Sequence, residues 1–120
     1  MAAELTIYHN PRCSKSRATL TLLRDAGLEP EIILYLETPP SAEQLGALLQ
    51  AMGLSARELI RTKEPPYKGL GLADETLSED TLVSHMVAHP VLIDRPIVVA
   101  GEQARLCQPP ERVPELIGTD

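Results

Sequence analysis

A single cysteine near the N-terminus has the surroundings of a reactive thiol. Cys13 lies in the segment HNPRCSKSR, directly after a short apolar run. No second cysteine follows at the spacing of a C-x-x-C motif, because Ser16 stands in that place. A thiol is a nucleophile only as its thiolate, and a cysteine with the ordinary pKa of about 8.5 is mostly protonated at pH 7. Cys13 therefore needs groups that lower its pKa, and a reaction partner other than a neighbouring cysteine.

Positive charge lies close to this cysteine in the sequence. Arg12, Lys15 and Arg17 flank Cys13, and His9 would add charge if protonated or would act as a hydrogen-bond partner. Cys13 also precedes a helical pattern, and the free N–H groups and dipole of a helix N-terminus favour an anion. We therefore predict a thiol with a lowered pKa beside N–H groups that can bind an oxyanion. The alternative is a small buried apolar side chain, the usual role of an intracellular cysteine.

The elements that position Cys13 form a strand–helix–strand unit. Residues 4–10 alternate as a short strand, and an apolar stripe of helical spacing then extends to Gly27, a suitable helix terminator. Residues 30–37 lie between prolines and have the composition of a buried strand. A unit of this kind has parallel strands and a right-handed connection.

The rest of the chain predicts more helices and a hairpin. Capping residues and breakers indicate helices over 41–53, 55–62 and 78–90, a loop over 63–72, strands over 96–100 and 104–107, and a final helix over 109–117. The order βαβ, three helices, ββα is a thioredoxin-like α/β plan. We predict a single domain over 1–120, with a helical insertion at about 41–90.

Three distant arginines are candidates to bind the same anion. In a thioredoxin-like plan the residue before the proline of the third strand lies beside the first helix N-terminus, and here that residue is Arg95. This proline is typically cis, so we predict a cis Arg95–Pro96 peptide bond. Arg105 lies in the last strand and Arg61 in the inserted helices. Three planar guanidinium groups match a tetrahedral oxyanion.

Composition restricts the possible classes of function. The chain has 120 residues, a net charge of -6 and 43% hydrophobic residues, which fits one cytoplasmic domain with reduced cysteines. Neither nucleic acid nor membrane is expected as a partner: no basic face dominates, no apolar stretch approaches the roughly 20 residues that span a bilayer, and no secretion signal is visible. His85 and His89 lack metal-ligand spacing, and we expect neither a metal nor a tightly bound cofactor.

Taken together, the motifs resemble one family over about residues 5–117. HNPRCSKSR, IRTKEPPY, IDRPIVV and ARLCQPPE closely resemble segments of the glutaredoxin-coupled arsenate reductases, which have a thioredoxin fold. The family's H-x3-C-x3-R signature is present. The resemblance implies that the catalytic residues are His9, Cys13 and Arg17, and that the substrate-binding residues are Arg61, Arg95 and Arg105.

The resemblance also implies a mechanism. The Cys13 thiolate attacks arsenate, glutathione joins at arsenic as a co-substrate, and glutaredoxin removes the glutathione as a mixed disulfide while arsenite forms. His9 would tune the pKa of Cys13. Glutathione would then supply the thiol that Ser16 does not, and the arginines would neutralise charge that otherwise repels a thiolate from a dianion.

Two other functions are compatible with the same fold. A glutathione-dependent thiol reductase or transferase of another substrate would also use Cys13. Related redox-responsive transcription adaptors bind RNA polymerase, but they typically sense oxidants through a C-x-x-C motif, which Ser16 interrupts. The second cysteine, Cys107, lies in the last predicted strand and is expected to be structural, while His85 and His89 are expected at the surface.

Overall fold

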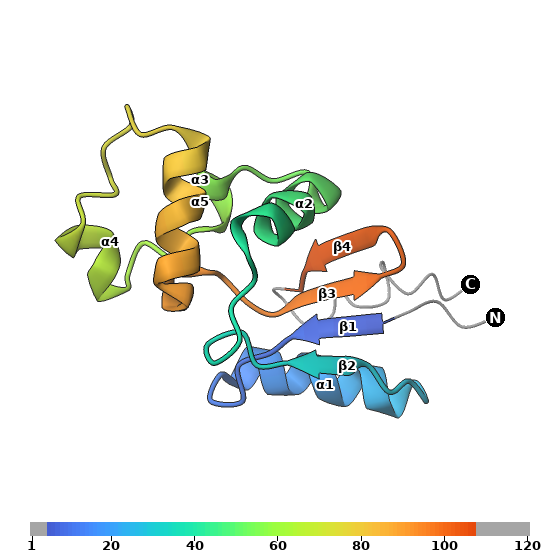
Figure 1. Cartoon of the computed structure of the whole chain (residues 1–120). Coiled ribbons are helices and arrows are strands. Elements are labelled where there is room, and N and C mark those ends of the chain that lie inside the picture. The colour runs from blue at the N-terminus through green and yellow to red at the C-terminus, as the bar shows by residue number, and fades with distance from the viewer. Residues whose placement is uncertain (1–4, 108–120) are drawn as a thin grey trace. The chain divides into compact units, whose positions relative to one another are not determined.

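The computed structural model describes residues 5–107, which fall into two compact units (Figure 1). One unit contains the described residues up to Thr38 and from Arg95 onward, and the other is Pro39–Asp94. The second unit corresponds to the helical insertion expected at about 41–90. The single domain over 1–120 stays a prediction, and the helix expected over 109–117 lies outside the described residues.

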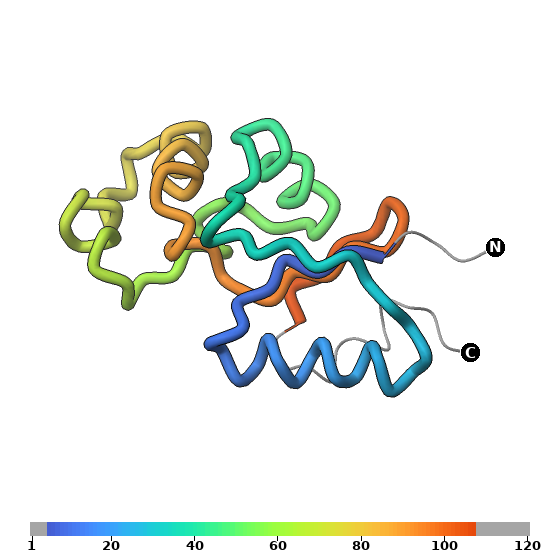
Figure 2. The backbone as a smooth tube through the Cα atoms, turned by 60° about the horizontal axis from the view of Figure 1, so that its bottom comes forward, coloured from blue at the N-terminus to red at the C-terminus, as the bar shows by residue number. Residues whose placement is uncertain are grey.

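The first unit is built on a four-stranded sheet in the order β2-β1-β3-β4. The strand β1 (Leu5–Tyr8) pairs in parallel with β2 (Glu31–Ile33) and antiparallel with β3 (Ile97–Ala100). The last strand, β4 (Gln103–Leu106), pairs antiparallel with β3. Helix α1 (Ser14–Asp25) connects β1 to β2 and runs along one face of the sheet (Figure 2). This is the thioredoxin-like α/β arrangement that the sequence predicts.

The hydrophobic core of this unit lies between α1 and the sheet. Leu20 and Leu23 of α1 pack in one buried cluster with Ile7, Val98 and Cys107. Cys107 is fully buried there, as expected of a packing residue, and neither cysteine forms a disulfide. The packing holds α1 against β1, and thereby fixes the turn between them that carries Cys13.

The strand predicted over 30–37 is shorter and more exposed than expected. β2 ends at Ile33, and two of its three residues, Glu31 and Ile32, are exposed. It lies at the edge of the sheet, with β1 as its partner, and the chain turns after it through hydrogen bonds to the Leu34 carbonyl. The apolar residues of this run are explained in part by the turn after β2, where Tyr35 is buried. The prediction of a buried strand over the whole run is therefore wrong.

The second unit is helical. Its elements are α2 (Ala42–Met52), α3 (Ala56–Leu59), α4 (Pro65–Gly69), α5 (Glu79–Ala88) and the 3-10 turn η1 (Pro90–Leu92). As predicted, the hydroxyls of Ser41, Ser55 and Ser78 accept N–H groups in the first turns of α2, α3 and α5. α3 ends before the predicted residue 62, because Ile60 leaves the helix to form a β-bridge with Ile93.

Helix α4 lies where the sequence predicted a loop over 63–72. Pro65 and Pro66 are in the first turn of α4, where a missing N–H costs no intrahelical hydrogen bond. After the helix, Gly71 adopts a positive φ of 67°, and the Arg57 guanidinium donates to the carbonyl of Leu72. The prolines and glycines therefore mark the ends of a short helix, and the prediction of a loop throughout is wrong.

Candidate active site

Cys13 is the N-cap residue of α1. Its N–H donates to the Asn10 carbonyl at 3.0 Å, and its carbonyl accepts the N–H of Arg17 at 3.0 Å. The backbone is extended at Cys13, and the side chain forms no capping hydrogen bond. Only 8% of the residue is exposed. The sulfur thus lies at a helix end, where the first N–H groups have no intrahelical acceptor.

The surroundings of Cys13 favour its thiolate. Burial by itself raises the pKa of Cys13, but hydrogen bonds from the backbone N–H groups of Ser16 and Lys15 lower it. The charge of Arg95 and a hydrogen bond from its side chain lower the pKa further, and the net result lies below the ordinary value. A thiol with a lowered pKa is what the sequence predicts at this position.

Arg95 reaches Cys13 from a distant part of the sequence. It precedes β3, and the Arg95–Pro96 peptide bond is cis, as predicted. The Pro96 carbonyl accepts the N–H of Cys107 at 2.9 Å, which attaches this turn to the end of β4. The fold therefore brings together two of the predicted site residues, the cysteine and one of the arginines.

His9 is a hydrogen-bond partner of Ser16 at this site. It is buried, with 5% exposed, and its Nδ1 lies 2.6 Å from the Oγ of Ser16. Burial lowers the pKa of His9, and the charges of Arg24 and Arg17 lower it further. These shifts disfavour the protonated imidazole, which is the form that would add positive charge near Cys13. Of the two expected roles, that of a hydrogen-bond partner fits the geometry.

The flanking cations contribute less directly than the sequence suggests. Arg12, Lys15 and Arg17 are exposed, and Lys15 favours the thiolate through its backbone N–H. Arg17 donates from Nη1 to the carbonyl of Pro11 at 2.9 Å. It thus braces the loop before Cys13, while its catalytic role stays a prediction.

Arg105 supplies a buried donor in the same unit. It lies in β4 opposite Val98 of β3, so both side chains are on the sheet face that α1 covers. Its Nε atom is buried and has no hydrogen-bond partner within residues 5–107. Such a group is costly to bury unless it is paired, and an anion would be a suitable partner.

Arg61 belongs to the helical unit. Its N–H donates to the Leu92 carbonyl at 2.8 Å, and its Nη1 lies 3.2 Å from Oε2 of Glu64. The sequence reasoning did not single out Glu64, although opposite charges three residues apart were a visible signal. The role of Arg61 in binding a substrate stays a prediction.

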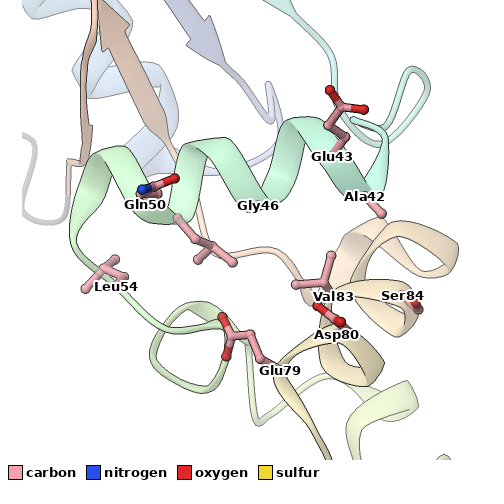
Figure 3. A pocket seen from close by; sticks show the side chains of 10 residues that line it. Ala42, Glu43, Gly46, Gln50, Leu54, Glu79, Asp80, Val83 and Ser84 are labelled. Atoms are coloured by element: carbon pink, nitrogen blue, oxygen red, sulfur yellow. The ribbon is translucent and has the colours of Figure 1, made fainter.

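A cavity of about 610 Å³ lies between α2 and α5 of the helical unit (Figure 3). Leu49, Leu54 and Val83 give it an apolar lining, with carboxylates of Glu43 and Asp80 beside them. None of the predicted site residues lines this cavity. We therefore assign the chemistry to the thiol site and not to this cavity.

Residues 5–107 contain neither a metal-binding cluster nor a membrane-spanning helix. That part of the chain contains no group of three His, Cys, Asp or Glu side chains placed to hold a metal ion. Its helices include none with the length and apolar character required to cross a membrane.

Comparison with known proteins identifies the family. The ArsC family model matches residues 8–116. The chain belongs to the ArsC family. This ArsC chain is 56% identical over 119 residues to the uncharacterized protein YfgD of Escherichia coli (strain K12), a match that covers 98% of the chain and 100% of YfgD. It is 49% identical over 115 residues to an arsenate reductase of the same strain, covering 96% and 82% of the two proteins.

A solved structure agrees with this assignment of the fold. The arsenate reductase from Vibrio cholerae matches the ArsC chain with a TM-score of 0.93 and 52% sequence identity, covering 97% of this chain and 99% of that one. The thioredoxin-like fold that the sequence predicts is therefore confirmed.

Proposed function

We propose that this chain reduces arsenate to arsenite, with glutathione and glutaredoxin as electron donors. The observation that carries the proposal is the Cys13 sulfur, which accepts hydrogen bonds from helix N–H groups and from the Arg95 side chain. Such a site suits attack on an oxyanion, because the same donors can stabilise the negative charge of the oxygens. Similarity to proteins named arsenate reductase supports arsenate as the substrate.

The chemistry follows four steps. The Cys13 thiolate attacks arsenic and displaces an oxygen, which leaves as water. The thiol of glutathione replaces a second oxygen in the same way. A glutaredoxin thiolate then attacks the glutathione sulfur and forms a mixed disulfide, while the electron pair of the sulfur–arsenic bond stays on arsenic and reduces it from As(V) to As(III). Water finally releases arsenite from Cys13.

The predicted site residues take separate roles in this proposal. Arg61, Arg95 and Arg105 bind the oxyanion, and Arg95 also stabilises the thiolate. His9 tunes Cys13 as a neutral hydrogen-bond partner, and Arg17 braces the loop through the Pro11 carbonyl. The reaction takes place in the cytoplasm, where glutathione keeps cysteines reduced.

The test is a coupled assay that follows NADPH oxidation with arsenate, glutathione, glutaredoxin and glutathione reductase. We expect an arsenate-dependent rate that disappears in Cys13→Ser, because the nucleophile is lost. The matched control is Cys107→Ala, which removes the other thiol and should retain the rate in a folded protein. A wild-type rate that does not depend on arsenate would contradict the proposal.

A glutathione-dependent thiol reductase is the second candidate. The stabilised thiolate of Cys13 favours it, because a thiolate also attacks disulfide sulfur. The same coupled assay, without glutaredoxin and with a small glutathione mixed disulfide in place of arsenate, separates the two. Turnover of the disulfide without turnover of arsenate would establish this second function.

A further inference from the structure

Ser16 occupies the position of the second thiol in a C-x-x-C motif, and its hydroxyl has a different use. The residue is fully buried, with 0% exposed. Its Oγ lies 2.6 Å from Nδ1 of His9 and accepts the backbone N–H of Asn10 at 3.0 Å. A hydroxyl can serve both groups, since it offers one donor and two acceptor positions.

These hydrogen bonds join the end of β1 to the first turn of α1. His9 and Asn10 directly follow β1, whereas Ser16 lies inside α1. The His9 N–H also donates to the Ile33 carbonyl at 2.8 Å, so the end of β1 is itself fixed to β2. The Ser16 side chain therefore connects the helix start to the sheet.

The nucleophile lies within the loop that these contacts close. Cys13 donates its N–H to the Asn10 carbonyl at 3.0 Å, and the N–H of Ser16 in turn bonds to the Cys13 sulfur. The side chain of Ser16 thus fixes Asn10, and its backbone supplies a donor to the thiolate. Ser16 therefore contributes to both contacts, through its hydroxyl to Asn10 and through its N–H to the Cys13 sulfur.

We propose that Ser16 is a positioning residue: its hydroxyl ties His9 and Asn10 to α1 and holds the helix N–H groups at the Cys13 sulfur. This inference rests on the proposed function, in which the Cys13 thiolate is the nucleophile. A thiol at position 16 would be a weaker hydrogen-bonding group. Position 16 can therefore hold either a hydroxyl that positions the loop or a resolving thiol, but not both.

The decisive measurement is the pKa of Cys13, followed by thiolate absorbance in a Cys107→Ala background so that one thiol titrates. Arg95 and the charges of Arg12, Lys15 and Arg17 remain in place in every variant. We expect Ser16→Ala to raise this pKa by about one unit. At pH values below the pKa, the thiolate fraction and the rate of iodoacetamide alkylation should then fall roughly tenfold. Ser16→Thr, which keeps the hydroxyl, should restore the original value.

The matched control is Ser14→Ala, on the same helical turn but exposed, which should leave the pKa unchanged. If Ser16→Ala does not fold, His9→Phe removes the partner of the hydroxyl while keeping a ring, and it should raise the Cys13 pKa in the same direction. A folded Ser16→Ala variant, or a folded His9→Phe variant, with an unchanged pKa and alkylation rate would overturn the inference.

These measurements do not require arsenate. A Cys13 pKa that depends on Ser16, in a protein without arsenate turnover, would remove the proposed function and leave the positioning role intact. Normal arsenate turnover with a Cys13 pKa that is independent of Ser16 would remove the positioning role alone.

Discussion

At the residue scale, the Cys13 sulfur is stabilised by two kinds of donor. The N–H groups of Lys15 and Ser16 belong to the helix backbone and are present for any sequence that forms α1. The Arg95 guanidinium is a side chain, so a single substitution can remove it. A substitution of Arg95 can therefore measure its contribution to the Cys13 pKa separately from that of the helix N–H groups.

Replacing Arg95 should therefore move the pH dependence of Cys13. In Arg95→Ala the thiolate loses a positive charge and a hydrogen bond, so the pKa of Cys13 should rise. Because alkylation requires the thiolate, its rate falls as the pH drops through this pKa, and the fall should occur at higher pH in the variant. The measurement is the rate of iodoacetamide alkylation between pH 5 and pH 9, a range of about two units on each side of neutrality.

Arg95→Lys serves as the control for charge. It keeps the positive charge without the planar fork of donors, so its profile should lie between those of the wild type and Arg95→Ala. Superimposable profiles for Arg95→Ala and the wild type would contradict the assigned role of Arg95.

At the element scale, serine caps decide where the helices of the second unit begin. The Ser41 hydroxyl accepts the Gln44 N–H at 3.1 Å, and the Gln44 side chain accepts the Ser41 N–H at 2.9 Å. This reciprocal pair satisfies two groups at the start of α2 that have no partner within the helix. The cap lies just inside the second unit, which begins at Pro39.

Removal of this cap should cost stability. Ser41→Ala should lower the free energy of unfolding by about 1 kcal/mol, the usual effect of losing a serine N-cap. Urea denaturation followed by circular dichroism measures the change. Ser84→Ala is the control, because Ser84 is exposed within α5 and alanine favours a helix interior. Equal losses in the free energy of unfolding for the two variants would show that the Ser41 cap does not stabilise the protein.

At the scale of the whole molecule, Arg105 places a charged side chain on the covered face of a sheet. Its Nε is buried without a hydrogen-bond partner among residues 5–107. Folding alone gains little from such a group, since replacing a buried charge with an apolar side chain of similar volume is often neutral or stabilising. A bound anion would supply the missing hydrogen-bond partner of Nε and would account for burying this group.

We therefore expect Arg105→Met to affect function and folding in different ways. The KM for arsenate should rise by about tenfold or more, equivalent to roughly 1.4 kcal/mol of lost binding, while the free energy of unfolding stays the same or rises. Arsenate kinetics and urea denaturation measure the two quantities. The control is Lys68→Met, which removes an exposed positive charge in α4 and should leave the KM unchanged.

A parallel loss of stability and of arsenate use in Arg105→Met would contradict this assignment. It would mean that the arginine supports the fold and does not bind the substrate.

The sequence by itself determined the features that depend on local chemistry. Serine caps located the starts of three helices, and the alternating and helical patterns defined the βαβ unit. The start of the helical pattern likewise placed Cys13 at the N-terminus of α1. The edge position of β2 and the helix α4 were missed, because strand partners and a short proline-initiated helix leave weak local signals.

The tertiary structure decided which distant groups meet at Cys13. The thioredoxin-like plan predicted from the sequence already placed Arg95 near Cys13, but only the fold gave it a hydrogen bond to the sulfur. The sequence left the charge of His9 open, and burial lowers the pKa of His9 because desolvation disfavours the protonated imidazole. The role of the Ser16 hydroxyl likewise emerged from the fold, since its partners lie at the end of β1, across the turn from α1.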